Sequence, residues 1–187
     1  LDCFENQLTS LEGLDKLVKL IYLDCSKNQL TSLEGLDKLV NLTRLYCSSN
    51  QLTSLEEARA LMHAARHGGE HGAGTMRLLL DAGADANQQD EDGTTALMVA
   101  AQFGGEHGAG MVRLLLDAGA DANQQDNDGA TALMVAVKHS VAPLATNRCT
   151  SASETLRALM AAGSDLDATD NHGNTCLLYT SDAADEE

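Results

Sequence analysis

Two sets of internal repeats account for most of this chain. Near the start, LDCFENQLTSLEGLDKLVKLIY is followed by LDCSKNQLTSLEGLDKLVNLTR at a period of 22 residues, and a shorter copy, LYCSSNQLTSL, comes next. Further on, residues 60–93 align with residues 96–129 at an offset of 36 residues, with 28 of 34 positions identical. Periods of this length are typical of proteins in which small units bury their apolar faces by stacking on one another. We therefore expect a solenoid with two kinds of layer.

The shorter repeat combines apolar residues with one asparagine at fixed spacing. Its second copy places Leu20, Leu23, Cys25, Asn28 and Leu30 in the pattern L-x-x-L-x-C-x-x-N-x-L. This pattern resembles the short leucine-rich repeat family. Side chains alternate along a strand, so the same residues predict a short strand whose leucine and cysteine point inward.

Each coil of this repeat is expected to contain one strand, one asparagine turn and an apolar back. The strand is predicted around residues 22–26, with Ser26 on its outer face. The equivalent asparagines should form a buried ladder that satisfies backbone groups: Asn6, Asn28 and Asn50. Four leucines should close the back: Leu33, Leu36, Leu39 and Leu42. The resemblance implies partner contacts on the strand face, although an ordinary solvated sheet explains the same residues: Tyr22, Asp24, Arg44 and Tyr46.

The longer repeat resembles the ankyrin family. The family's opening, G-x-T-P-L-H-x-A-A, appears as GTTALMVAA from Gly93 and again as GATALMVAV from Gly129, and its L-L-x-x-G-A-D-x-N appears as residues 79–87 and 115–123. A third copy begins at Ala132 and carries the insertion SVAPLATNRCTSAS between its two helices. The resemblance implies paired helices followed by a projecting hairpin, here called a finger. The fold class is therefore a mixed α and β repeat solenoid.

Local signals agree with helix, helix and turn, and two departures stand out. Gly83 and Gly119 follow LLLDA, where a left-handed C-cap is expected. Asp92-Gly93 and Asp128-Gly129 are tight-turn pairs that set the fingers. The stretch GGEHGAG is expected to form a glycine-rich bend between helices. The departures are alanine for the family's proline, at Ala96 and Ala132, and methionine for its histidine, at Met98 and Met134.

The boundaries are predicted as about two and a half leucine-rich repeats over residues 1–57 and about three ankyrin repeats over residues 58–175. At the junction, Leu55 should complete the last coil, and residues 56–67 should form the first ankyrin helix. An artificial join between two genes is an alternative. The chain opens inside a repeat, without an initiator Met, and is expected to be a fragment.

Residues 176–187 do not continue the ankyrin period. CLLYTSDAADE equals one translated frame of a transposon-end adapter used in sequencing libraries, so we interpret it as adapter read-through. The alternative is that Cys176 and the two leucines after it continue the repeat. No function is assigned to this tail.

Composition narrows the partner and the environment. The net charge is −16 and no basic stripe exists, so nucleic acid is not expected as a partner. No run of 18 apolar residues occurs, so no membrane insertion is expected. The five cysteines are odd in number and three share the 22-residue period. Free thiols in a reducing compartment follow, either the cytoplasm or a host cytosol into which the protein is delivered.

Motifs for chemistry are weak throughout. His63, His67 and His71 have a spacing that could hold zinc, but Gly68-Gly69 should break the helix and the second copy lacks two of the histidines. DANQQDEDG lacks two carboxylates of a calcium loop, and GGEHGAG lacks the lysine of a phosphate loop. No catalytic set recurs. We expect no enzyme activity, no metal and no cofactor.

Differences between the two near-identical copies suggest where a partner binds. Four of the six differences, at positions 63/99, 66/102, 67/103 and 91/127, fall where the ankyrin family places contact residues. Drift at unconstrained positions explains the same pattern equally well. The candidate contacts on the concave face and fingers are Arg66, His67, Glu91, Asp92, Gln102, Phe103, Asn127, Asp128, Lys138 and His139.

The resulting hypothesis is a non-enzymatic protein-interaction scaffold, with a partner of unknown identity on a continuous concave surface. One alternative is the substrate-recruiting part of a larger enzyme or microbial effector. Another is a simple spacer.

Overall fold

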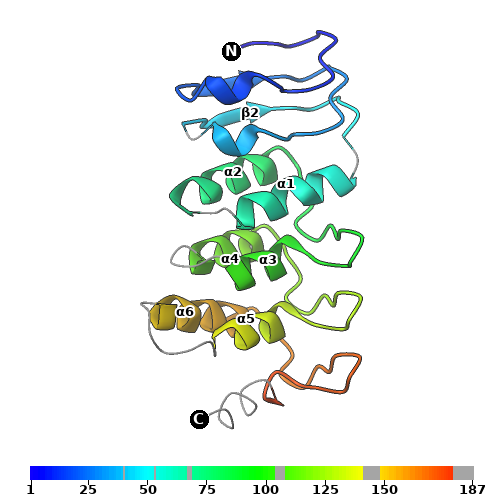
Figure 1. The fold of residues 1–187 in the computed structure, drawn as a ribbon, viewed down its shortest axis with the longest axis vertical. Helices are drawn as coiled ribbons and strands as arrows, with labels where there is room; N and C mark the ends of the chain where they lie inside the picture. The colour runs from blue at the N-terminus through cyan, green and yellow to red at the C-terminus, as the bar shows by residue number, and fades with distance from the viewer. Residues whose placement is uncertain (40, 53, 67–68, 104–107, 141–147, 179–187) are drawn as a thin grey trace.

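The computed structural model is an elongated stack of layers, with the leucine-rich coils at the N-terminal end and the helix pairs after them (Figure 1). It describes the whole chain except residues 40, 53, 67–68, 104–107, 141–147 and 179–187. The first residues and the last described residues lie at opposite ends of the stack. This is the arrangement expected when each layer contacts only its neighbours.

The leucine-rich coils are built from short strands and 3-10 turns. Strands β1 (Tyr22–Asp24) and β2 (Arg44–Tyr46) pair in parallel, with Tyr22 opposite Arg44, and the first coil joins them through a bridge between Asp2 and Asp24. Opposite the strands lie η1 (Leu14–Lys16) and η2 (Leu36–Lys38). The chain crosses between strands without an α-helix because each coil is only 22 residues long.

The interior of the coils follows the predicted alternation, with one correction. Leu23, Cys25 and Leu30 are fully buried, and the predicted leucines of the back are buried too. Ser26 was expected on the outer face but is buried. The strand ends at Asp24, and the Asp24 carboxylate accepts a hydrogen bond from the Ser26 amide at 3.0 Å. The turn therefore begins before the alternation reaches Ser26.

The predicted asparagine ladder is present. Asn28 is buried, its Oδ1 accepts from the Leu8 amide at 3.0 Å, and its Nδ2 lies 2.8–3.1 Å from the carbonyls of Cys3, Cys25 and Ser26. Asn50 repeats these contacts one coil later and is half-buried. Asn6 bonds only to carbonyls of its own coil and is exposed, so the expected burial fails there. No described coil precedes it.

The described residues contain six α-helices in three antiparallel pairs: α1 (Ser54–Arg66) with α2 (Gly69–Asp81), α3 (Ala96–Phe103) with α4 (Gly108–Asp117), and α5 (Ala132–Ser140) with α6 (Arg148–Ala161). The inner helices stack in the order α1, α3, α5, and the outer helices in the order α2, α4, α6 (Figure 1). Buried alanines between the inner helices, such as Ala65 and Ala100, allow close packing. Within the described residues no helix is long and apolar enough to cross a membrane.

The junction differs from the prediction by two residues. Helix α1 begins at Ser54, so Leu55 lies in the first helix of the ankyrin repeats. The same letters, TSLE, lead into a 3-10 turn in the two earlier coils. After position 55 the sequence EEARALMHAA has high helix propensity, and helix formation extends backward into the shared letters.

The glycine-rich stretches are more helical than expected. Helix α2 includes GEHGAG from Gly69, and α4 begins at Gly108 in the equivalent stretch. A Cβ on Gly108 would lie 3.4 Å from the Ala100 carbonyl, so glycine permits close approach of α4 to α3. The inserted segment of the third copy is corrected in the same way, because residues 148–153 belong to α6.

Each helix pair is followed by a finger. Gly83 and Gly119 end α2 and α4 with positive φ, as predicted. In the first finger the Asp90 carboxylate accepts from the amides of Asp92 and Thr94 at 3.0 and 2.9 Å, and Gly93 has φ of 76°. The same arrangement recurs at Asp126 and Asp170. The third finger therefore extends the ankyrin pattern to the residues before Cys176.

Candidate functional site

Side chains in the last turns of the inner helices form a row across three layers. Arg66 lies at the end of α1, and its guanidinium carbon is 4.8 Å from the centroid of the Phe103 ring at the end of α3. Gln102 Nε2 lies 2.9 Å from Nε2 of His139 on α5. Phe103 is 44% exposed although it is a large apolar residue. We call Arg66, Gln102, Phe103, Lys138 and His139 the inner-helix row.

The hydrogen bonds of His139 define its orientation. Its Nδ1 lies 2.9 Å from the Val135 carbonyl, which can only accept, so Nδ1 carries the proton. Nε2 then accepts from the Gln102 side-chain amide in the neutral tautomer. The contact between adjacent layers thus orients both side chains, and Lys138 lies beside them on the same helix.

The finger residues divide into exposed acids and one structural amide. Asp92 and Asp128 are exposed, and Glu91 lies 3.5 Å from the Arg59 guanidinium. Asn127 instead connects neighbouring fingers, because its amide donates to the Asp92 carbonyl and its Nδ2 to the Glu91 carbonyl, both at 3.0 Å. Asn171 bonds to the second finger in the same manner.

The difference between Glu91 and Asn127 therefore has a packing reason. The first finger has no described finger before it, so position 91 has no neighbouring carbonyl to bond. Positions 127 and 171 have one, and both are asparagine. Asn127 therefore has a structural role between fingers, because its backbone N–H, its backbone carbonyl and its Nδ2 are all hydrogen-bonded to neighbouring fingers.

A second amide ladder was missed by sequence reasoning. Asn87 Oδ1 accepts from the Asp121 amide at 2.6 Å and its Nδ2 donates to the Gly119 carbonyl at 2.9 Å. Asn123 makes the same pair of bonds to the next layer, and Gln89 bonds to the Gln125 carbonyl at 2.9 Å. The signal in the sequence is the identity of DANQQD in both copies, which by itself names no bonding partner.

One further candidate position is corrected. Position 63/99 was counted among free contact positions, but Val99 is buried at 4% exposure between layers, while His63 is exposed. The two residues therefore differ because their helices pack against different layers. They are not equivalent positions on one exposed surface. His67 lies outside the described residues.

The strand face forms a second set of candidate residues. The rings of Tyr22 and Tyr46 are 5.8 Å apart between centroids, and the Tyr22 hydroxyl donates to Asp24 at 3.4 Å. Partial burial and the carboxylates of Asp24 and Asp2 raise the pKa of the Tyr22 hydroxyl. Arg44 is exposed and lines an open hollow of about 370 Å³ with Tyr46 and the C-terminal end of α2.

The structure does not bring the two sets together. Strand β2 lies against α2, at residues 78–82. The inner-helix row lies at the C-terminal ends of α1, α3 and α5, and α1 runs antiparallel to α2 (Figure 1). The end of α2 beside the strands is therefore the end remote from Arg66, about 18 Å along a helix of this length.

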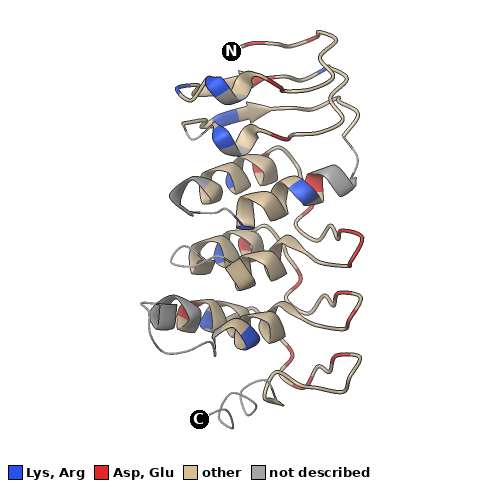
Figure 2. Ribbon diagram, viewed as in Figure 1, with Lys and Arg blue, Asp and Glu red and all other residues tan. Residues whose placement is uncertain are grey.

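Charges are also separated. Acidic residues cluster along the fingers at one edge of the stack, whereas the described basic residues lie on the helices and coils (Figure 2). The exposed finger residues Asp92 and Asp128 are therefore acidic, whereas the last turns of the inner helices carry Arg66, Lys138 and His139.

Among the described residues, no group of three or more His, Cys, Asp or Glu is placed to hold a metal ion. His63 and His71 belong to different helices, α1 and α2, and His67 lies outside the described residues. Burial raises the pKa of the Cys25 thiol to about 12 and raises that of Cys47, so both are protonated and unreactive near neutral pH. Four cysteines are free thiols: Cys3, Cys25, Cys47 and Cys176.

Comparison with protein families agrees with this geometry. A model of leucine-rich repeats in two copies matches residues 1–38 and 18–60, and a model of ankyrin repeats in three copies matches residues 61–145. No curated protein matches the chain. The chain therefore joins leucine-rich repeats at its N-terminus to ankyrin repeats. Repeats of both families are general protein-interaction modules and are typically non-catalytic.

Proposed function

We propose that this chain is a non-enzymatic scaffold that binds a protein partner across the inner-helix row and the fingers. The observation that carries the proposal is the row itself. Its side chains connect three layers through the contact of Arg66 with Phe103 and that of Gln102 with His139. An exposed aromatic ring oriented by an arginine is the kind of anchor that dominates binding energy in protein interfaces.

The charges of the fingers and of the inner-helix row indicate what kind of partner segment would bind there. A partner segment would place an apolar or aromatic group on Phe103 and acidic groups beside Arg66 and Lys138. Basic groups on its other side would meet the exposed carboxylates of Asp92 and Asp128. The strand face, on the side of α2, would then be a separate surface. We therefore propose two surfaces, with the continuous one limited to the ankyrin repeats.

A random-peptide display library selected on the full chain tests this function. For a selected peptide, Phe103→Ala should weaken binding by about 2 kcal/mol, because it removes the central ring. Asp128→Ala should cost under about 0.5 kcal/mol, because rim charges contribute little. Isothermal titration calorimetry of both variants measures the difference.

Equal effects of the two substitutions would exclude the row as the binding centre. Selected peptides that lose affinity on Tyr46→Ala and keep it on Phe103→Ala would move the site to the strand face.

A further inference from the structure

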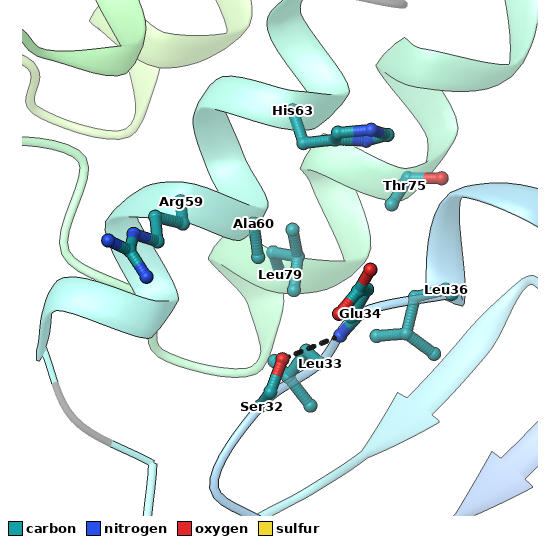
Figure 3. A pocket seen from close by; sticks show the side chains of 10 residues that line it. Ser32, Leu33, Glu34, Leu36, Arg59, Ala60, His63, Thr75 and Leu79 are labelled. Carbon is teal, nitrogen blue, oxygen red and sulfur yellow. Dashed lines mark hydrogen bonds between the residues drawn. The ribbon is translucent and has the colours of Figure 1, made fainter. Parts of the chain in front are cut away.

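A pocket of about 240 Å³ lies where the last leucine-rich coil meets the first helix pair. Its walls come from both repeat types: residues 32–36 of the coil, Ala60 and His63 of α1, and Thr75 and Leu79 of α2 (Figure 3). In this view the side chains of Leu33, Leu36 and Leu79 lie near one another between the coil turn and the two helices, whereas Arg59 points away from them. We call it the seam pocket. It has no counterpart in the families' separate patterns, since it needs both arrays.

The second ankyrin copy shows what normally fills this space. Positions 63 and 75 of the first copy correspond to Val99 and Met111, which are 4% and 0% exposed because α3 and α4 pack on the preceding helix pair. In the first copy the preceding layer is the coil turn, which covers less. His63 is exposed and Thr75 is half-buried. Two of the six differences between the copies thus lie in the seam pocket, both replacing an apolar residue with a polar one.

The lining indicates the chemistry of an occupant. The floor is apolar, formed by the buried side chains of Leu33, Leu36 and Leu79. The rim carries the exposed carboxylate of Glu34 and the imidazole of His63, whereas the guanidinium of Arg59 points away from the pocket and lies 3.5 Å from Glu91. The volume is below the roughly 300–1,000 Å³ of pockets that hold whole cofactors or drug-sized ligands. It therefore suits a single side chain.

We propose that the seam pocket binds an uncharged aliphatic side chain, of leucine or methionine size, from the protein partner. The inference rests on the proposed function, because His63, which lines the pocket, lies one turn before Arg66 of the inner-helix row on α1. The partner's side chain takes the place that the preceding repeat's side chains occupy in the next layer. The fusion of two repeat types thus creates a specificity site.

Small probes test the pocket without a partner. N-acetyl-leucine amide and N-acetyl-methionine amide are titrated into the full chain and followed by amide NMR shifts of residues 32–36, Ala60 and Thr75. N-acetyl-lysine amide and N-acetyl-glutamate amide serve as charged controls. The uncharged probes should bind at least about tenfold more tightly than either charged one.

The chain supplies its own filled variant. His63→Val combined with Thr75→Met installs the side chains of the second copy, which that repeat already accommodates, and should weaken probe binding at least about tenfold. Met76→Val is the matched control, because it also copies the second repeat but lies in the core outside the pocket. It should leave binding within about twofold.

Saturable binding of the lysine probe with equal affinity, or unchanged binding in the filled variant, would overturn the proposal. Failure of every probe to bind would also overturn it, because His63 and Thr75 would then be ordinary solvent-exposed residues at the end of the ankyrin repeats. Phe103→Ala separates this from the proposed function, since it should weaken binding of the selected peptide by about 2 kcal/mol, roughly thirtyfold, and leave probe binding intact. If probes bind but the filled variant binds the selected peptide normally, the assignment of the pocket to the partner fails.

Discussion

The leucine-rich coils and the ankyrin layers both use side-chain amides to join adjacent layers, but the amides are buried in the coils and exposed in the ankyrin layers. In the coils, Asn28 is buried and bonds to backbone groups of two coils, beside a parallel backbone ladder. In the ankyrin layers, Asn123 is exposed and bonds to the next layer at Asp165 and Gly163, while helix packing provides the core. A layer without helices depends on its amide. A layer with helices uses its amides to align fingers.

Thiol reactivity should show the largest contrast, because Cys25 lies in the closed coil interior. With its pKa raised to about 12, its thiolate fraction at pH 8 is about a thousandfold below that of an ordinary thiol. Iodoacetamide labelling followed by peptide mass spectrometry should find Cys3, which is half-buried, modified long before Cys25. Labelling of Cys25 at the rate of Cys3 would show that the coil opens freely.

The same shift has a pH consequence. The folded pKa lies above the ordinary thiol value of 9.0, so the neutral thiol is favoured in the folded state. This stability is complete below about pH 9 and is lost as the pH rises toward 12. Cys25→Ala should reduce that alkaline loss in urea-unfolding measurements.

Removing the amide should separate the two regions by free energy. Asn28→Ala should lower the free energy of unfolding by about 4 kcal/mol, because it leaves several buried backbone groups without partners. Asn123→Ala should cost about 1 kcal/mol, since water replaces its exposed bonds. Urea denaturation measures both. Similar losses for the two variants would mean that both asparagines stabilise the fold equally and that the burial of Asn28 adds nothing to its contribution.

The fingers provide a paired glycine test. Gly93→Ala should cost about 2–3 kcal/mol, because φ is positive and the new Cβ would lie 2.8 Å from the Asn127 amide nitrogen. Gly83→Ala has the same kind of φ but nothing within 4 Å, and should cost about 1 kcal/mol. Thermal unfolding of both variants isolates the contribution of the finger stack. Equal losses would show that finger stacking adds nothing.

The smallest effect concerns one exposed contact in each region. Lys27 lies 4.9 Å from the Phe4 ring centroid across two coils, as Arg66 lies 4.8 Å from that of Phe103 across two helix pairs. Double-mutant cycles on stability should give about 0.5–1 kcal/mol of coupling for each pair. A coupling near zero for Arg66 and Phe103 would mean that the arginine does not orient the ring.

Much of this organisation could be predicted from residue spacing. The period of 22 residues located the strands, the buried leucines and the asparagine ladder, and the offset of 36 residues located the helix pairs, their glycine caps and the fingers. These features are local or repeat with the period, so a single chain contains several copies of the same signal. The boundaries at residues 57 and 175 stay predictions, as does the adapter origin of the tail.

Only the tertiary structure decided what each repeat meets at its ends. Val99 and His63 occupy the same place in their repeats, yet one is buried by a helix pair and the other faces a coil turn. Glu91 and Asn127 differ for the same reason, since only one has a finger before it. Sequence determines the layer, because its periodicity is internal to each repeat. The seam pocket and the separation of the two surfaces depend on how the last leucine-rich coil packs against the first helix pair. The period within one repeat type does not predict how that repeat packs against a repeat of the other type.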